Sequence, residues 1–243
     1  MIPKIIHYCW FGGRPLPRMA QKCKDSWMSF FPDYEIREWN ESNFDVWKHE
    51  YSKFCYEHKL WAYLSDYVRL VVVEEYGGLY FDTDVEVVRR PDELLADCVA
   101  YFGWETPEFV NTVLGFAAVP HHEAVRAMRE KYDGLFVDGK YCYVNGKMWG
   151  CPQLNTLALE EWGLARDGSR QEVCGAEILP VDYLCPYTDA TGELSLTDRT
   201  VSIHWFNKSP HGKVAVWRMK LLRPVRRLLK WARTKFACCH VIL

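Results

Sequence analysis

Several common motifs are absent from this 243-residue chain, and each absence removes a class of protein from consideration. No Gly-x-x-x-x-Gly-Lys-[Ser/Thr] stretch occurs, which argues against a P-loop enzyme. None of the ten cysteines forms a Cys-x-x-Cys pair, so we expect reduced thiols rather than a zinc framework. No apolar run approaches the ~18 residues that span a bilayer, and no secretory signal precedes the first predicted strand. The sequence therefore predicts a cytosolic protein of ordinary domain length.

Acidic residues are also absent after Asp198. Residues 1–198 carry 19 Lys and Arg against 32 Asp and Glu, a net charge of −13, whereas the remainder carries eleven bases. Within residues 213–243, apolar side chains recur at helical spacing: Trp217, Leu221, Val225, Leu228, Leu229, Ala232 and Phe236. This pattern is typical of a helix lying on an anionic membrane surface. The open alternative is a helix packed on the acidic body, and nucleic-acid binding is not expected because that body is acidic.

The remaining residues, 1–212, are predicted to form one domain in which strands and helices alternate. Strands are predicted at residues 2–8, 34–39, 79–81, 85–88, 99–104, 112–119, 178–181 and 201–205. Helices are predicted at residues 18–31, 44–58, 60–73, 122–132 and 153–162. Such alternation favours a layered α/β sheet.

Two carboxylates follow one of these strands directly. Gly77 and Gly78 suit the end of a helix and a tight reversal, and residues 79–81 suit a buried strand. Asp82 and Asp84 then arrive one residue apart, where an unpaired buried carboxylate would be very costly. Paired carboxylate oxygens suit Mg²⁺ or Mn²⁺, which can in turn hold a diphosphate. The alternative is a pair of solvated acids in a turn.

The helix before this strand carries a second polar stripe. Ala62, Ser65, Asp66 and Arg69 recur at helical spacing, on a different face from the apolar residues. Such a stripe can lie beneath a polar ligand. It can also be a surface ion pair between Asp66 and Arg69, worth only a few tenths of a kcal/mol.

Together, these motifs resemble a known enzyme family. Ala62-x-x-Ser65-Asp66-x-x-Arg69, followed by Tyr76-Gly77-Gly78-x-Tyr80-x-Asp82-x-Asp84, resembles the sugar-binding region of glycosyltransferase family 32. It is also similar to the glucosyltransferase domain of large clostridial toxins. Residues 2–13 look like the opening strand and nucleotide loop of the family, and Ile203-His204-Trp205 with Ser209 is a weaker match near the end. The family usually ends in Ser-Trp, whereas Pro210 follows Ser209 here.

The resemblance implies a GT-A-type, Rossmann-like mixed sheet flanked by helices, with Mn²⁺ or Mg²⁺ as cofactor. It implies catalytic roles for Asp66, Arg69, Asp82 and Asp84; substrate contacts for Trp10, Gly12, Gly13, Ser65, Asn111 and Ser209; and metal ligation by Asp82, Asp84 and His204. Asp84 would bind the metal directly, and Asp82 would contact both the ribose and the metal shell. A buried core role for Trp10 or His204 remains the open alternative.

The implied function is a retaining hexosyltransferase. The donor would be a UDP- or GDP-sugar, and the acceptor a surface glycan such as capsule, lipopolysaccharide or a lipid-linked oligosaccharide. The basic tail would hold the enzyme on the inner face of the membrane as a peripheral protein. Two alternatives remain open: a nucleotidyltransferase that makes sugar nucleotides, and a non-catalytic, membrane-associated glycan-binding module.

The tail generates the first prediction. Removing residues 213–243 should release the protein from anionic vesicles, because each base near the surface contributes about 1 kcal/mol. Burial of the apolar stripe adds a contribution that salt does not screen. Donor hydrolysis should be largely unchanged, because the sugar and metal motifs lie earlier in the chain. Vesicle sedimentation at two salt concentrations measures the effect. Full-length protein that stays in the supernatant at low salt would rule out the membrane role.

Overall fold

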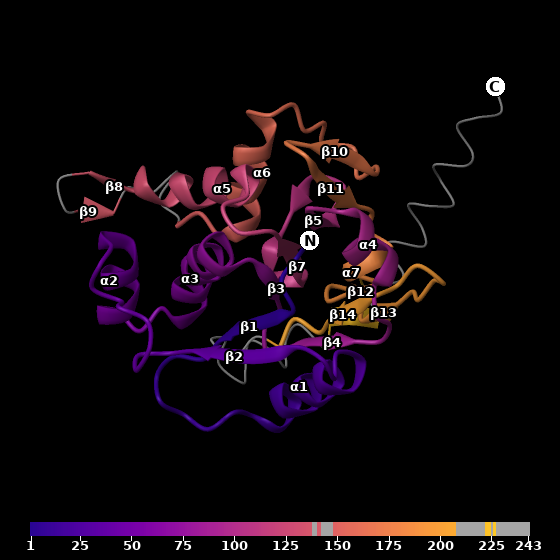
Figure 1. Ribbon diagram of the computed structural model, residues 1–243, viewed down its shortest axis with the longest axis horizontal. Helices are drawn as coiled ribbons and strands as arrows, with labels where there is room; N and C mark the ends of the chain where they lie inside the picture. The colour runs from indigo at the N-terminus through magenta and orange to yellow at the C-terminus, as the bar shows by residue number, and fades with distance from the viewer. Residues whose placement is uncertain (138–139, 142–147, 208–221, 225, 227–243) are drawn as a thin grey trace.

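A mixed sheet forms the centre of the computed structural model, which describes residues 1–137, 140–141, 148–207, 222–224 and 226 (Figure 1). Its strand order is β10-β11-β5-β7-β3-β1-β2, with β6 paired to β5. The strands are β1 (Ile5–Cys9), β2 (Glu35–Trp39), β3 (Gly78–Tyr80), β5 (Ala100–Thr106), β6 (Phe109–Val110), β7 (Phe116–Ala118), β10 (Gln171–Val173) and β11 (Ala176–Leu179). The α/β class predicted from the sequence is confirmed, as is the mixed sheet implied by the resemblance.

The strand directions place several carboxyl ends at one edge of this sheet. β1 pairs in parallel with both β2 and β3. β7 is antiparallel to both β3 and β5, so β3 and β5 run in the same direction. β11 is parallel to β5. In open α/β sheets, ligands bind outside the carboxyl ends of the strands, which makes this edge the expected position of a site.

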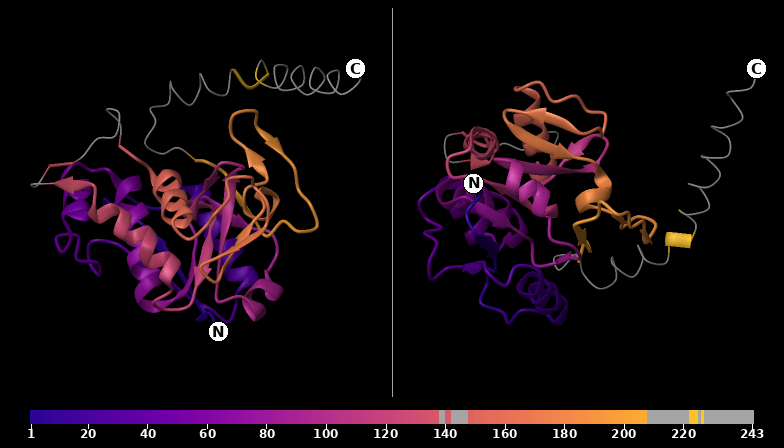
Figure 2. Two further views of the ribbon diagram at one scale, coloured as in Figure 1. Left: turned by 90° about the horizontal axis from the view of Figure 1, so that it is seen from above. Right: turned by 45° about the vertical axis from the view of Figure 1, so that its right-hand side comes forward.

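Helices cover both faces of the sheet (Figures 1 and 2). The helices are α1 (Arg18–Phe30), α2 (Glu50–Glu57), α3 (Trp61–Tyr76), α4 (Asp92–Asp97), α5 (Glu123–Asp133), α6 (Cys151–Glu160) and α7 (Val181–Leu184), with the 3-10 helix η1 (Thr112–Leu114). One buried cluster contains side chains of α2, α3, α5 and α6, and a second contains side chains of α1 and α7. Alternate residues of β3 join the two clusters, Leu79 on the α1 side and Tyr80 on the α3 side.

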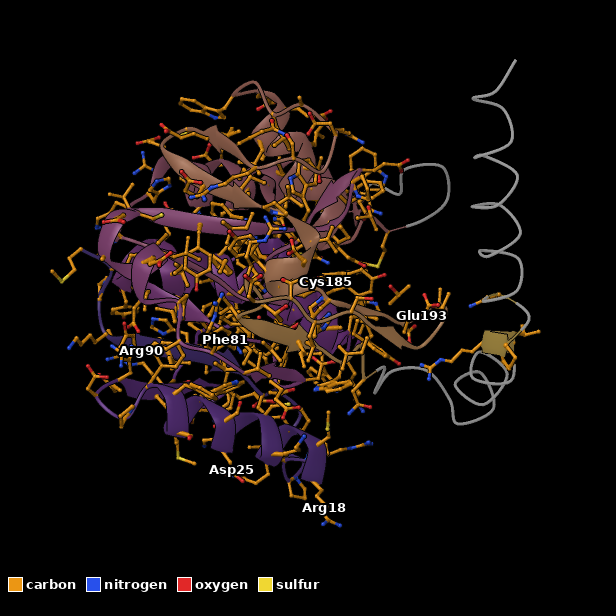
Figure 3. All side chains as sticks on the ribbon, turned by 90° about the vertical axis from the view of Figure 1, so that its right-hand side faces the viewer. Arg18, Asp25, Phe81, Arg90, Cys185 and Glu193 are labelled. Atoms are coloured by element: carbon orange, nitrogen blue, oxygen red, sulfur yellow. The ribbon has the colours of Figure 1, made fainter. Side chains whose placement is uncertain are left out.

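Three shorter strand pairs complete the fold. β4 (Val85–Val87) pairs with β14 (Ser202–His204), β12 (Tyr187–Thr188) with β13 (Glu193–Leu194), and β8 (Phe136–Val137) with β9 (Lys140–Tyr141). The β4–β14 pair brings a late segment of the chain beside the acidic turn that follows β3. Phe81 lies inside the molecule between that turn and α1, with its ring centroid 5.5 Å from that of Trp27 (Figure 3).

Two predicted elements differ from the structure, and both differences have a local cause. The helix predicted at 44–58 begins only at Glu50, because side chains of Asn40, Asn43 and Asp45 bond to nearby backbone N–H groups and hold residues 40–47 in turns. The strand predicted at 112–119 begins as η1. There, the side chain of Asn111 accepts a hydrogen bond from the Val113 N–H, and Gly115 turns the chain at φ 102° into β7.

The basic tail lies mostly outside the described residues. Neither the proposed boundary at residue 212 nor the membrane role of residues 213–243 is tested, and both stay predictions. Of the described part, Arg223 contacts the β12–β13 hairpin, where its guanidinium lies 3.1 Å from the Asp189 carboxylate. None of the described helices is long and apolar enough to cross a bilayer.

His7 joins three parts of the sheet from a fully buried position on β1. Trp39 of β2 donates its indole N–H to Nδ1 of His7 at 3.0 Å, which leaves Nε2 to donate to the Gly77 carbonyl at 2.8 Å. Burial lowers the pKa of His7 to about 4, although the bond to Gly77 opposes that shift. The neutral imidazole therefore fixes the reversal that leads into β3.

This histidine predicts a pH dependence of stability. Because folding lowers its pKa from 6.5 to about 4, the unfolded chain takes up a proton in that window that the native protein does not. The contribution, about 3 kcal/mol, is fully present above pH 6.5 and is lost as the pH falls to about 4. His7→Gln should therefore flatten the fall in unfolding free energy across this range, measured by urea denaturation. Parallel pH curves for the two proteins would contradict this account.

Candidate active site

The acidic turn begins where β3 ends at the ligand-binding edge of the sheet. Gly77 and Gly78 have φ values of 63° and 106°, and a Cβ at either position would lie 2.6 Å from Pro120 or from the Ile5 carbonyl. Only glycine therefore permits the helix α3 to reverse so closely into β3. After Phe81, residues 82–84 form a turn in which the Val85 N–H donates to the Asp82 carbonyl at 2.9 Å. Both carboxylates are half-buried at this point.

Asp84 is held by the segment that includes β14. His204 Nε2 lies 3.2 Å from one carboxylate oxygen, and the Asn207 N–H donates to the other at 2.6 Å. Burial alone would raise the pKa of Asp84, but these two partners outweigh it and the pKa falls below its ordinary value. Burial would lower the pKa of His204, yet the neighbouring Asp84 raises it overall. The pair is thus stabilised in its charged form.

Asp82, Asp84 and His204 have the geometry of a divalent-cation site. One potential ligand atom from each lies within 4.8 Å of the other two. Two carboxylates and an imidazole form a donor set that Mn²⁺ accepts, and Mg²⁺ accepts the oxygens. Nδ1 of His204 has no hydrogen-bond partner among the described residues, although it is buried. The residues present therefore fit the metal that the resemblance implies.

Arg69 is buried beside this cluster and pairs with two carboxylates. Its side chain is only 1% exposed, and its guanidinium lies 2.9 Å from Asp66 and 3.0 Å from Asp82. The guanidinium also lies over the ring of Tyr80, 5.0 Å from its centroid. Burial raises the pKa of Asp66 to about 7, although Arg69 opposes that shift. The alternative of an Asp66–Arg69 surface pair is wrong, because the pair faces the interior and links α3 to the acidic turn.

Residues at the amino end of α6 pack against this ion pair. The backbone of Cys151 opposes the rise in the pKa of Asp66, and the sulfur of Cys151 lies 3.9 Å from Arg69. Thr112 Oγ1 lies 2.9 Å from that sulfur, and Asn155 Oδ1 accepts from both Thr112 and Cys151. The sequence motifs did not identify Thr112 or Asn155, and they noted Cys151 only as an insertion in a Gly-Pro turn. These positions show no catalytic pattern because their role is to hold other residues.

Residues 17–100 match the family model described as "Glycosyltransferase sugar-binding region containing DXD motif". Over this segment the chain is similar to the sugar-binding region of glycosyltransferases. It is 33% identical to "Inositol phosphoceramide mannosyltransferase 3" of Schizosaccharomyces pombe, over 48% of this chain and 33% of that protein. It is 28% identical to "Lactosylceramide 4-alpha-galactosyltransferase" of Pongo pygmaeus, over 61% of this chain and 69% of that protein.

Among solved structures, "PaToxG Glycosyltransferase" matches with a TM-score of 0.48 and 15% identity, over 66% of this chain and 69% of that chain. The first relative matches over about a third of its own length. The family model spans the segment from the start of α1 to the start of β5. It thus includes Ser65, Asp66, Arg69 and the DXD residues Asp82 and Asp84, but neither the nucleotide loop nor β14.

The loop predicted to bind the nucleotide lies at the carboxyl end of β1. Gly12 adopts φ 90° and packs on the ring of Trp61, where an added Cβ would lie 2.9 Å from the ring. Its N–H donates to the Glu41 carboxylate at 2.6 Å. Trp10 is partly exposed, and its indole N–H donates to the Arg14 carbonyl. Gly13 has φ 62° and open space around it. The loop stands at the expected edge, and the contact of Trp10 with a base stays a prediction.

The other predicted substrate residues have mixed outcomes. Ser65 Oγ donates to the Trp61 carbonyl one turn earlier, at 2.8 Å, and is half-buried. Asn111 is 4% exposed and uses its side chain on Glu105 and on the Val113 N–H. The structure thus gives Asn111 protein partners, and its proposed contact with the sugar stays a prediction. Ser209 lies outside the described residues.

The burial of Arg69 makes a stability prediction. Arg69→Met should lower the free energy of unfolding by about 3–5 kcal/mol, because it leaves the buried Asp66 and the half-buried Asp82 without their cation. Adding Asp66→Asn should recover part of that loss. Arg37→Met is the matched control, since Arg37 pairs with an exposed Glu35 and should cost at most about 1 kcal/mol. Urea denaturation measures all three variants. Equal losses for Arg69→Met and Arg37→Met would refute the buried-pair account.

Proposed function

We propose that this protein is a metal-dependent, retaining hexosyltransferase that uses a UDP- or GDP-sugar. One observation carries the proposal: the possible cation ligands and the Asp66–Arg69 ion pair lie at one edge of the sheet and share Asp82. Asp82, Asp84 and His204 can hold a cation there, and Arg69 links Asp82 to Asp66 at 3.0 and 2.9 Å. The match to the glycosyltransferase family model supports the same conclusion, because its region contains Asp66, Arg69, Asp82 and Asp84, although not His204.

Asp82, Asp84 and His204 would hold Mn²⁺ or Mg²⁺. When bound, the ion supplies stabilisation of the negative charge that develops on the leaving diphosphate. The protein fixes its ligands beforehand: the Asn207 N–H orients Asp84, and Arg69 orients Asp82. Such preorganised groups need little rearrangement during the reaction. The raised pKa of His204 means that a proton competes with a cation for this imidazole.

Asp66 and Arg69 would bind the donor sugar. The Asp66 carboxylate can accept hydrogen bonds from sugar hydroxyls, and the planar fork of Arg69 can donate to a hydroxyl or a phosphate oxygen. Their mutual pairing at 2.9 Å limits the positions that both groups adopt. Ser65 lies one position before Asp66 on the same helix, and Trp10 would stack near the base, with Gly12 and Gly13 beside it.

Retention of configuration is proposed from the family resemblance. None of the residues assigned above is a convincing nucleophile, so a same-face displacement within an ion pair is the proposed mechanism. The oxygen of the departing phosphate would take the proton of the acceptor hydroxyl. The residues of the protein would then orient donor and acceptor relative to each other and exclude water from the reacting centre.

The acceptor is proposed to be a glycan or glycolipid at a membrane surface. The printed names of both relatives mentioned above include a ceramide lipid. Capsule, lipopolysaccharide and lipid-linked oligosaccharide all present hydroxyl groups of this kind. A peripheral position on the inner face of the membrane, held by the basic residues 213–243, would bring the active site to such acceptors.

Asp84→Asn should lower sugar transfer by about 10²–10³-fold while leaving the fold intact, because it removes a charged ligand from the metal site. The wild-type protein is first screened with UDP- and GDP-sugars for Mn²⁺-dependent donor hydrolysis. Chelation should abolish that activity, and added Mn²⁺ should restore it. Turnover of the purified variant is then compared with that of the wild type on the best donor.

Asp97→Asn serves as the control, since Asp97 is exposed on α4, away from the site. Activity of Asp84→Asn close to that of Asp97→Asn, without excess metal, would refute the metal assignment. Pyrophosphate release from a sugar phosphate and a nucleoside triphosphate would identify a nucleotidyltransferase instead. Glycan binding without any donor hydrolysis would identify a non-catalytic module.

A further inference from the structure

Glu105 is a carboxylate near the active site that lacks a cationic partner among the described residues. Its one described hydrogen bond comes from Asn111 Nδ2, at 2.6 Å. The side chain is half-buried, near the end of β5. Asp66 and Asp82 share Arg69, and Asp84 pairs with His204. Glu105 therefore differs from these three aspartates, because no Lys, Arg or His in the described part of the chain lies at ion-pair distance from it.

The backbone at Glu105 departs from a regular ladder. β5 pairs with β6 at Trp104↔Val110 and at Thr106↔Phe109, and the register shifts between these two pairs. Glu105 is the residue between them, so it occupies the position of a β-bulge. Bulges turn a side chain away from its regular direction and occur often beside active sites. The deviation in the strand thus falls on Glu105, which has no described cationic partner at ion-pair distance.

Asn111 fixes the direction of this carboxylate. Its Oδ1 accepts from the Val113 N–H at 3.1 Å, so its Nδ2 is the group that donates to Glu105. Its backbone N–H donates to the Gly103 carbonyl at 3.0 Å, which ties the residue to β5. Both the backbone and the side chain of Asn111 are therefore held in place, and Asn111 acts as a positioning residue for Glu105.

Contacts through η1 connect this pair to the active site. Thr112, next to Asn111, lies 2.9 Å from the sulfur of Cys151, which lies 3.9 Å from Arg69. The carbonyl of Leu114, at the other end of η1, accepts from Ser202 of β14 at 3.4 Å. The η1 segment thus packs between the residues that hold Arg69 and the strand that carries His204, and Asn111, the partner of Glu105, directly precedes it. Its charge also adds a small part to the raised pKa of His204, which Asp84 dominates.

The charge of Glu105 restricts what it can contact. An unneutralised carboxylate repels a diphosphate, so it does not suit the nucleotide half of a donor. Carboxylates accept strong hydrogen bonds from hydroxyl groups, and such charge-assisted bonds are roughly twice as strong as neutral ones. The neutral, hydroxyl-rich part of a substrate is therefore the suitable partner.

We propose that Glu105, oriented by Asn111 at the β5 bulge, accepts a hydrogen bond from a sugar hydroxyl in the active site. This inference rests on the proposed glycosyltransferase function. The hydroxyl belongs either to the donor hexose or to the acceptor glycan. Both sources present the same chemistry, and kinetics separates them.

Glu105→Gln tests the proposal, because glutamine keeps an oxygen that can accept from Asn111 while it removes the charge. Glu108→Gln is the matched control, since Glu108 lies three residues later and is exposed. Donor hydrolysis without acceptor and sugar transfer with acceptor are measured for both variants. Thermal unfolding should show that both variants retain the fold. The Mn²⁺ concentration for half-maximal activity should be unchanged in Glu105→Gln, because Glu105 is not a proposed metal ligand.

A contact with the donor sugar predicts that Glu105→Gln lowers kcat/KM for donor hydrolysis by about 10- to 100-fold, with unchanged affinity for free UDP or GDP. A contact with the acceptor predicts unchanged hydrolysis and a loss of the same size in kcat/KM for the acceptor. Asn111→Leu should reproduce part of either loss through misplacement of Glu105. Kinetics of Glu105→Gln within about twofold of Glu108→Gln would overturn this inference alone. A wild-type protein inactive with every UDP- and GDP-sugar would overturn the proposed function and this inference with it.

Discussion

The ion pairs of Arg69 are the interaction on which the rest of the candidate site depends. Burial of two carboxylates is unfavourable without a cation, and one guanidinium compensates both Asp66 and Asp82. The two acids come from different elements, α3 and the turn after β3. Their shared partner therefore fixes the distance between the helix and the turn. The hydrogen bonds of Cys151, Thr112 and Asn155 then hold the ion pair in place from the side of α6.

Asp84, in the other half of the site, is held by a segment far away in the sequence. His204 and the Asn207 N–H reach Asp84, and Asn207 stands 123 residues after it in the chain. The antiparallel pairing of β4 with β14 positions this segment, with His204 opposite Val85. The acidic turn is thus held by Arg69 on one side and by β14 on the other. These two supports fix the separation of Asp82 and Asp84, on which the proposed cation site depends.

The charges at this sheet edge explain why a cation and hydroxyl groups are its suitable ligands. Asp66, Asp82 and Asp84 face one Arg and one His, so the cluster retains negative charge. The proposed divalent cation would remove that excess and would favour the binding of a diphosphate. Glu105 stands outside this compensation, which is why we assign it to the neutral part of a substrate. The repulsion among like charges is an energetic cost, and such costs tend to persist where function requires them.

The sequence by itself determined the α/β class, the glycine reversal, the Asp82–Asp84 turn and the spacing of Asp66 and Arg69. These features depend on backbone preferences and on periodicity within a few residues, so local sequence is sufficient to predict them. Tertiary structure alone decided that Arg69 is buried, that it bridges two carboxylates, and that Glu105 lies at a bulge. An ion pair at i,i+3 looks the same in sequence whether it faces water or the interior. Its environment is set by segments far along the chain, whose approach depends on the packing free energy of the whole domain.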